Sequence, residues 1–300
     1  MSFTGKTEYG KILAAKLRSQ LVVEGLFARE YKGDALGVAV KTPMTDDDTL
    51  SSDYDGANIS NNTVTYLSNK YVTTNVNHHP FVNKYIPGFN LTTASWDAKA
   101  GAVESAAYSV AKAMNTAAIT VLIKGAQGLD EAGNAYGSTD PRYQLAGSII
   151  AYATDFYTTL ATMSGKMTDA GVPMEDRYCI VNGDGQALAL ASPLAVKYGQ
   201  DEQAINGGVI AELCGFKIKV SNLVTGNATA AGAGSATGIL AVCGHPAFGI
   251  NPADYEEEPT LVSGNYSQNT VGGVFVKALA HFAYDISDPR AFGLIVKATA

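Results

Sequence analysis

The sequence predicts an α+β fold, and three observations carry this prediction. Residues 41–76 join a polar, Asp-rich stretch to one rich in β-branched and aromatic residues, as expected of an extended two-stranded ribbon. Residues 95–124 are rich in alanine and place apolar side chains at helical spacing. Short apolar runs typical of strands, with two short helical segments between them, follow residue 177 and form a mixed α/β block.

The segment before the ribbon is expected to be an arm followed by a strand. Residues 9–31 carry apolar side chains among charges, but too few of them to build a domain. At residues 36–40 the side chains of Leu36, Val38 and Val40 share one face, which predicts a half-buried strand.

The ribbon at residues 41–76 has little apolar surface of its own. An isolated two-stranded ribbon is barely stable in water, and a long polar loop is uncommon inside a compact domain. We therefore expect the ribbon to lie across an adjacent subunit. The expected contact residues are Val64, Tyr66, Leu67, Tyr71 and Val72 along the strands and Asp46, Asp47, Asp53 and Asp55 at the tip.

Two helices are predicted after the ribbon. The first covers residues 95–124 with Ser95 or Asp97 as its cap, and its length corresponds to a rod of ~40 Å. The second begins at Asp140, with Pro141 in the first helical position, and ends at Gly165. Its buried side chains are expected to be Leu145, Ile149, Phe156, Leu160 and Met163.

The mixed block contains the predicted strands. They lie at residues 177–181, 238–243, 271–286 and 291–300, with short helical turns at 185–191 and 192–199. The run at 238–243 shows no alternation, which favours a central strand. The stretch "GGVIAELCGFKIKVSN" (207–222) predicts a strand pair with Gly215 at the bend. We expect a flexible loop at 225–238 and a solvated carboxylate cluster at 255–259.

Charge and composition exclude some classes of protein. The net charge is −7 and no basic block is present, which argues against a protein that tracks nucleic-acid phosphates. Only 16% of the residues are charged, so we expect subunit contacts to cover part of the surface in a homo-oligomer. The first residues lack an apolar signal core, and no long apolar run predicts a membrane span, which together favour a cytoplasmic product.

No catalytic, cofactor-binding or metal site is predicted, and the protein is not expected to be an enzyme. The cysteines Cys179, Cys214 and Cys243 are expected to be reduced packing residues in strand-like runs, because no CxxC pair is present. A nucleophilic Cys214 would need a nearby base and a positive setting, and no histidine lies near it in sequence. The adjacent His78 and His79 would point to opposite faces of a strand, which is unsuitable for sharing one metal.

The order of the predicted elements resembles the major capsid protein of tailed bacteriophages, which has the Hong Kong 97 phage capsid fold. The resemblance is sharpest in "MTDAGVPMEDRYCIVNGDGQALALASPLAVKYG" followed by "GGVIAELCGFKIKVSNLV". In that family a helix enters a "VP…R" turn, then a strand and a short helix, and a "G…I.GF.V..SN" strand pair belongs to the axial domain. "REYKGDALGVAVKTP" resembles the entry to the family's extended loop.

The resemblance implies a division of the chain and a role. It implies an N-terminal arm at 1–32, an extended β-ribbon loop at 33–88, a discontinuous peripheral domain with a long spine helix at 89–165 and 252–300, and a mixed α/β axial domain at 166–251. Identical subunits would form the pentamers and hexamers of an icosahedral head shell around the phage genome. Scaffolding, portal and decoration proteins are the implied partners, packaged DNA is near the shell without specific binding, and no membrane is involved. The implied location is the virion, after assembly in the host cytoplasm.

Two alternatives stay open at this point. Encapsulins share the fold and enclose a protein cargo, so the content of purified shells distinguishes them from capsids. A soluble oligomeric α/β enzyme with an unrecognised site would elute as a small oligomer, whereas a shell protein forms much larger particles.

Overall fold

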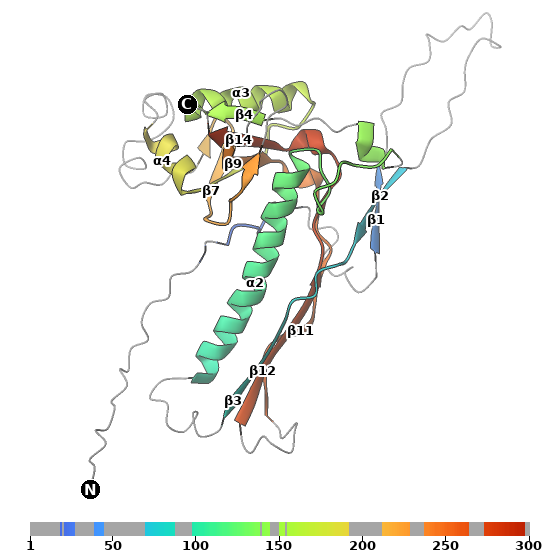
Figure 1. Cartoon of the computed structure of the whole chain (residues 1–300), viewed down its shortest axis with the longest axis vertical. Helices are drawn as coiled ribbons and strands as arrows, with labels where there is room; N and C mark the ends of the chain where they lie inside the picture. The colour runs from blue at the N-terminus through green and yellow to red at the C-terminus, as the bar shows by residue number, and fades with distance from the viewer. Residues whose placement is uncertain are drawn as a thin grey trace, which may run out of the picture.

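The computed structural model of the chain describes residues 19, 21–27, 39–44, 70–87, 98–138, 140–144, 150–153, 155–191, 212–228, 237–263 and 273–297. Figure 1 shows a block of strands and short helices at one end of the molecule, from which the long helix α2 (Ala98–Gly125) leads away. A narrow sheet runs beside this helix, and a separate two-stranded ribbon lies at its side.

The block is built on a seven-stranded sheet. Its strand order is β4-β14-β9-β5-β7-β6, and β8 pairs with β9 outside this path. Two pairs are parallel, β4 with β14 and β5 with β7, and the others are antiparallel. The strands are β4 (Ile150–Ala153), β5 (Tyr178–Val181), β6 (Glu212–Leu213), β7 (Phe216–Val220), β8 (Asn227–Ala228), β9 (Thr237–Gly244) and β14 (Gly293–Lys297). The predicted central strand at 238–243 is confirmed as β9.

Two helices accompany this sheet, α3 (Phe156–Asp169) and α4 (Gly183–Ala191). The buried side chains of α3 include Phe156, Leu160 and Met163, as predicted from their spacing. Its cap is Asp155, whose side chain accepts a hydrogen bond from the backbone N–H of Thr158. Such a cap satisfies one of the unpaired N–H groups at a helix start.

The prediction of one helix from Asp140 to Gly165 is wrong. The chain forms the short 3-10 helix η4 (Pro141–Gln144) and then the strand β4, before α3 begins at Phe156 and continues past Gly165 to Asp169. Strand β4 pairs in parallel with β14, more than a hundred residues away in sequence. Because this pairing partner is distant, local periodicity gave no sign of it.

The long helix α2 packs on a three-stranded sheet in the order β11-β12-β3. The strands are β3 (Phe81–Pro87), β11 (Ala253–Ser263) and β12 (Gly273–Phe282). Burial alternates along β12, so one face of the strand points to the helix. Ala102 and Ala106 of α2 pack with Val274 and Val276 of β12, and Val110 packs with Ala278 and Ala280. The small side chains of α2 allow this close approach, as the sequence predicts.

Helix α2 differs from one expectation. Residues Lys99–Gly125 are long and apolar enough to cross a membrane by length and composition, although no such run was predicted. In this structure the apolar residues on the buried face of α2 pack into the hydrophobic core. At its end, Gly125 lies against the side chain of Ile286 with no room for a Cβ atom.

Strand β11 was not predicted. The carboxylate cluster at 255–259 was expected to be solvated, and Glu256 and Glu258 are exposed, but these residues also form an edge strand that pairs with β12. Its register shifts between Tyr255 and Glu257 and again between Glu257 and Thr260. Charges and bulges are common on edge strands because they prevent pairing with other chains. Similarly, the loop expected at 225–238 includes β8 and the start of β9.

The ribbon is confirmed as an antiparallel pair, β1 (Ala39–Met44) and β2 (Lys70–Asn75). Residues 36–38 of the strand predicted at 36–40 lie outside the described residues, and β1 continues beyond Val40 to Met44. Strand β3, at the end of the implied extended loop, pairs with β12 and so belongs to the sheet beside α2. The remaining short elements are β10 (Gly249–Ile250), β13 (Asp285–Ile286), η5 (Pro246–Phe248) and η6 (Pro289–Ala291).

Candidate functional site

The base of the ribbon is the part of the described chain where elements far apart in sequence meet around charged side chains. In strand β2 the side chain of Val72 lies opposite Thr42 of β1, and both are buried in the subunit. The neighbouring Tyr71 is 48% exposed. The hydroxyl of Thr74, two residues after Val72 in β2, donates a hydrogen bond to Oδ2 of Asp285 at 3.2 Å, which ties the ribbon to β13.

Arg142 of η4 joins this contact from the other side. Its guanidinium donates to both carboxylate oxygens of Asp140, at 2.9 and 2.7 Å, to Oδ1 of Asp285 and to the carbonyl oxygen of Ile286 at 3.0 Å. The same group lies over the ring of Tyr136, with 4.3 Å between the guanidinium carbon and the ring centroid. We call Thr74, Tyr136, Asp140, Arg142 and Asp285 the Arg142 cluster.

The electrostatics of the cluster depend on Arg142. Burial alone would lower the pKa of Arg142, but its hydrogen bonds to Asp140 and the charge of Asp285 raise it, so the guanidinium stays charged. Burial would raise the pKa of Asp140, and the hydrogen bonds and charge of Arg142 hold it below the usual range. For Asp285 the balance is reversed, since burial raises the pKa more than Arg142 and the other donors lower it. Asp285 is therefore the carboxylate of the pair whose ionised form is more disfavoured by burial.

A second copy of the local motif shows what burial adds. The sequence Asp-Pro-Arg occurs at 140–142 and again at 288–290, and each copy starts a 3-10 helix. Asp288 accepts from the backbone N–H and side chain of Arg290, as Asp140 does from Arg142. The side chain of Arg290 is 47% exposed, whereas that of Arg142 is 7% exposed. The two turns thus share their chemistry and differ in environment.

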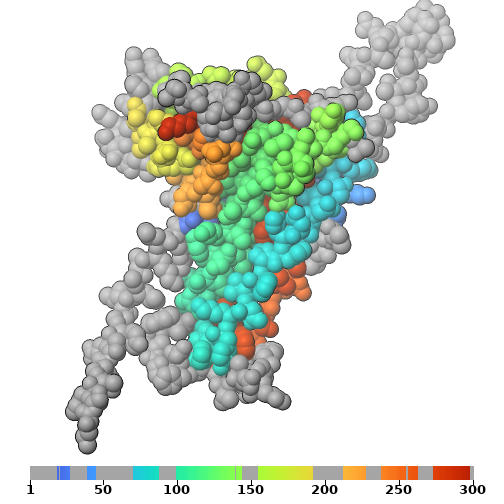
Figure 2. Space-filling view, in the orientation of Figure 1, coloured from blue at the N-terminus to red at the C-terminus, as the bar shows by residue number. Residues whose placement is uncertain are grey.

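Residues 76–80 connect the ribbon to β3 and are bonded to two other segments, strand β12 and the segment that contains Glu131. His78 exchanges backbone hydrogen bonds with Phe282 of β12, and their rings stack at 5.0 Å between centroids. Its Nε2 contacts Oε1 of Glu131, whose other oxygen accepts from Asn77 at 3.0 Å. Figure 2 shows the segment from residue 70 to 87 running past helix α2 on the face of the molecule. The ribbon therefore leaves the subunit from a well-defined base.

The adjacent histidines, which were predicted to lie in a strand, lie between β2 and β3 and make different contacts. His79 meets the ring of His281 through their Nδ1 atoms, and the Nε2 of His281 lies 2.6 Å from Oε2 of Glu256. Among the described residues, no group of three or more histidine, cysteine, aspartate or glutamate side chains is arranged to hold a metal ion.

The end of the N-terminal arm is anchored on two elements. On α2, Oδ1 of Asn115 accepts from the backbone N–H groups of Val22 and Val23 at 2.7 and 3.0 Å. On β7, Nζ of Lys219 donates to the carbonyl oxygens of Val22 and Glu24 at 3.2 and 2.7 Å. Leu26 and Phe27, which follow, are buried in the main core.

These anchor residues were not predicted to be functional. Lys217, two residues earlier in the same strand, is exposed and paired with Asp176. Desolvation by burial lowers the pKa of Lys219, in keeping with its place under the arm. The sequence offered one signal, the polar Asn115 in the middle of an otherwise apolar stretch of α2.

The comparisons with known proteins give a match in structure only. No protein-family model matches the chain, and no curated protein matches it. Among solved structures, the capsid of the cyanophage P-SCSP1u is similar with a TM-score of 0.74 and 16% identity, over 99% of this chain and 94% of that one. A structure from Mycobacterium phage Che8 gives 0.70 and 18% over 98% of both chains, and the capsid of an empty GTA particle gives 0.61 and 13% over 98% and 95%. The chain has the Hong Kong 97-like phage capsid fold.

The motif that first indicated the capsid fold has a structural role. Arg177, at the end of "VPMEDR", is 1% exposed. It donates to the carbonyl oxygens of Val172 and Pro173 at 2.6 and 2.8 Å and to Ser164 and Thr168 of α3. The arginine thereby satisfies two carbonyl groups of the turn after α3 and joins this turn, which leads into β5, to the last part of the helix.

The predicted strand pair at 207–222 is described from Glu212 onward, as β6 and β7, and it contains Cys214. Strands β6 and β7 are joined by Cys214 and Gly215, with φ of 51° and 79°. Cys214 was expected in a strand, but it forms part of this tight turn. Its Sγ lies 3.8 Å from the carbonyl oxygen of Tyr157, and burial raises the pKa of the thiol, which opposes formation of the nucleophilic thiolate.

The structure describes two of the residues predicted to contact a neighbouring subunit. Val72 is 1% exposed within its own subunit and has no surface left for such a contact, so this assignment is wrong for the described conformation. Tyr71 points outward, and its intersubunit role stays a prediction. The other predicted contacts lie outside the described residues; they are Val64, Tyr66, Leu67, Asp46, Asp47, Asp53 and Asp55.

Proposed function

We propose that this chain is a major capsid protein, which assembles with copies of itself into the icosahedral head shell around a phage genome. The observation that carries the proposal is the extent of the structural match. Capsid structures cover 98 to 99% of this chain, and the chain covers 94 and 95% of theirs in the P-SCSP1u and GTA capsids. A fold can serve other functions, so the role has to be tested on particles.

The proposed division of labour follows from the elements. Residues 1–32 act as the arm, 33–88 as the extended loop, 166–251 as the axial domain, and 89–165 with 252–300 as the peripheral domain. Strand β3, at the end of the loop, pairs with β12 of the peripheral domain. Pentamers and hexamers of the chain make the shell in the host cytoplasm before it becomes part of the virion. Scaffolding, portal and decoration proteins are further partners, packaged DNA contacts the shell non-specifically, and the role is structural without catalysis.

The ribbon supplies the sharpest test of assembly. Met44 and Lys70 are opposite residues of β1 and β2, so a short Gly-Asn-Gly-Ser turn can replace residues 45–69 and leave the base of the ribbon paired. A second variant keeps the original length but replaces 45–69 with glycine and serine. The first variant shortens the ribbon and removes its side chains, whereas the second keeps the length and removes the side chains alone.

The expected results separate folding from assembly. The unmodified chain should form closed particles by electron microscopy and sedimentation velocity. Both variants should keep the circular dichroism and melting temperature of a folded subunit but fail to close a shell, because the intersubunit contacts are missing. Closed particles from both variants would contradict the ribbon's role. An unmodified chain that stays a small oligomer would contradict the shell function itself.

The content of the particles distinguishes a capsid from an encapsulin-like compartment. Particles purified from infected cells should protect DNA from nuclease. Particles that hold an enzyme and no DNA would replace the genome shell with a cargo shell as the function.

A further inference from the structure

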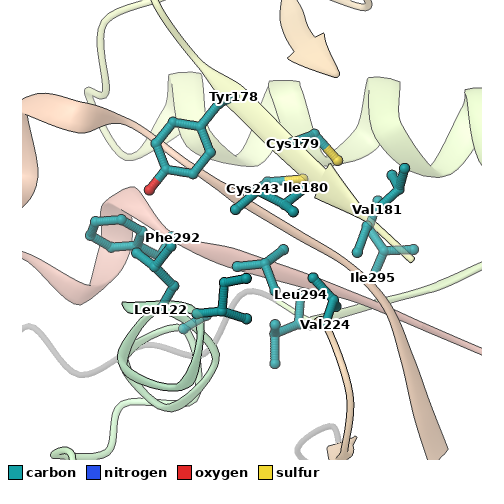
Figure 3. Close-up of a cluster of buried hydrophobic side chains, with 14 of the residues drawn as sticks. Leu122, Tyr178, Cys179, Ile180, Val181, Val224, Cys243, Phe292, Leu294 and Ile295 are labelled. Carbon is teal, nitrogen blue, oxygen red and sulfur yellow. The ribbon is translucent and has the colours of Figure 1, made fainter. Parts of the chain in front are cut away.

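Two thiols face one another inside the seven-stranded sheet. Cys179 of β5 and Cys243 of β9 are opposite residues of an antiparallel pair, both are 0% exposed, and both are free thiols. The neighbouring Cys179 contributes, after burial, to the raised pKa of Cys243. Figure 3 shows their sulfur atoms in the core, near Tyr178 and Ile180.

The register places these cysteines at a site that suits a covalent bond. The backbone N–H of Asn182 donates to the carbonyl oxygen of Leu240 at 3.0 Å, which makes 182 and 240 a hydrogen-bonded pair of the ladder. Because such pairs alternate with non-hydrogen-bonded ones, Ile180 and Val242 are of the first kind and Cys179 and Cys243 of the second. Opposite residues of the second kind have Cα atoms about 4.5 Å apart. Disulfides join Cα atoms roughly 4.4 to 6.8 Å apart, so the bond fits without moving either strand.

We propose that Cys179 and Cys243 form a disulfide across β5 and β9 when the folded protein meets a small-molecule disulfide such as oxidised glutathione. One cysteine thiolate attacks oxidised glutathione, forms a mixed disulfide and releases one glutathione thiolate. The second cysteine thiolate attacks the mixed disulfide, forms the Cys179–Cys243 bond and releases the second glutathione. The cysteines lose two electrons and two protons, and two molecules of reduced glutathione carry them away.

The bond would form slowly and persist. Burial raises the pKa of Cys243 well above its usual value, so the attacking thiolate is scarce and reaction requires transient opening of the sheet. The cell interior keeps thiols reduced, while the outside favours disulfides. The inference rests on the proposed function only for the place of oxidation, because a released shell moves from the first environment to the second. The closed loop, residues 179–243, contains α4, β6, β7 and β8.

The experiment uses the full-length chain with Cys214→Ser, so that only the pair can react. After incubation of the folded protein with oxidised glutathione, the number of thiols titrated in denaturant should fall from two to zero, and the intact mass should decrease by two hydrogen atoms. A non-reducing peptide map should join the peptides of Cys179 and Cys243. The melting temperature should rise on the order of 10 °C, as expected for a loop of this length. The matched control, Cys179→Ser with Cys214→Ser, should show neither the link nor the rise.

A refolding experiment tests the same cysteine pair in case oxidised glutathione cannot reach the buried thiols of the folded protein. The reduced chain is unfolded in urea and refolded in a buffer of oxidised and reduced glutathione, where both thiols are accessible before the sheet closes. Folded protein with the Cys179–Cys243 link supports the proposal. Protein that regains its native circular dichroism with both thiols reduced overturns it. Neither experiment requires a shell, so the result is independent of whether the chain assembles.

Discussion

Replacing Arg142 with methionine is expected to destabilise the subunit and to loosen the base of the ribbon. The substitution keeps most of the apolar stem but removes the cation between Asp140 and Asp285. The Thr74 hydroxyl and the backbone N–H of Ile286 then become the remaining donors to Asp285 within the described contacts. Two partly buried carboxylates would lie close together without their counter-charge.

The expected cost follows from the burial of the pair. Removing one partner of a buried ion pair typically costs about 3 to 5 kcal/mol, because the other charge stays desolvated. The carboxylates of Asp140 and Asp285 keep 24% and 20% exposure, so we expect the lower end, ~3 kcal/mol. For a chain of 300 residues that corresponds to a fall in melting temperature of about 5 °C.

The assay is urea denaturation combined with amide hydrogen exchange of β2. Exchange near Thr74 should accelerate in Arg142→Met, because Asp285 no longer has a fixed position. The matched control is Arg290→Met, which removes the exposed copy of the same turn contact and should cost at most ~1 kcal/mol. Adding Asp285→Asn to Arg142→Met removes a stranded charge and should restore part of the stability. If Arg142→Met costs no more than Arg290→Met, the Arg142 cluster does not fix the ribbon.

Three further outcomes are expected. Gly215→Ala should lower the free energy of unfolding by ~1–2 kcal/mol in urea denaturation, because Gly215 has a positive φ. Gly165→Ala in α3 should raise it by ~0.5–1 kcal/mol. Both sites have open space for a Cβ atom, so equal effects would contradict the backbone argument. Lys219→Met should increase hydrogen exchange at residues 21–27 about tenfold through lost hydrogen bonds, and exchange unchanged relative to Lys217→Met would show that Lys219 does not hold the arm. Ala106→Glu should place an unpaired charge between α2 and β12 and give insoluble protein, so normal solubility and melting temperature would show that this face is open.

Long, regular elements could be predicted from the sequence. Helix α2 and the central strand β9 were identified because their apolar pattern extends over many residues. Strand β4 was absorbed into a predicted helix because its stability comes from pairing with β14, which the local pattern does not contain. Strand β11 was missed for a related reason, since its glutamates are compatible with an edge strand only once β12 is in place.

The candidate site was less accessible to sequence reasoning. The ribbon itself was expected, but the Arg142 cluster brings together residues from β2, η4 and β13 that lie up to 211 positions apart. A buried arginine looks like a surface residue until its carboxylate partners are known. Val72 was assigned to an intersubunit contact because an apolar residue in a polar ribbon needs a cover, and the structure shows that the same subunit provides it.

The double anchoring of the arm links its position to the internal geometry of the subunit. Residues 22–24 are bonded both to Asn115 on the long helix and to Lys219 on the seven-stranded sheet. Hydrogen bonds weaken steeply beyond about 3.5 Å, so a shift of the sheet against the helix by an ångström or two must break one of the two sets. A partner that binds the arm and strains these bonds therefore shifts the equilibrium between arrangements of the helix and the sheet. By thermodynamic reciprocity, a change of arrangement alters the binding free energy of that partner by the same amount. Binding at the arm and the arrangement of the helix against the sheet are therefore thermodynamically coupled.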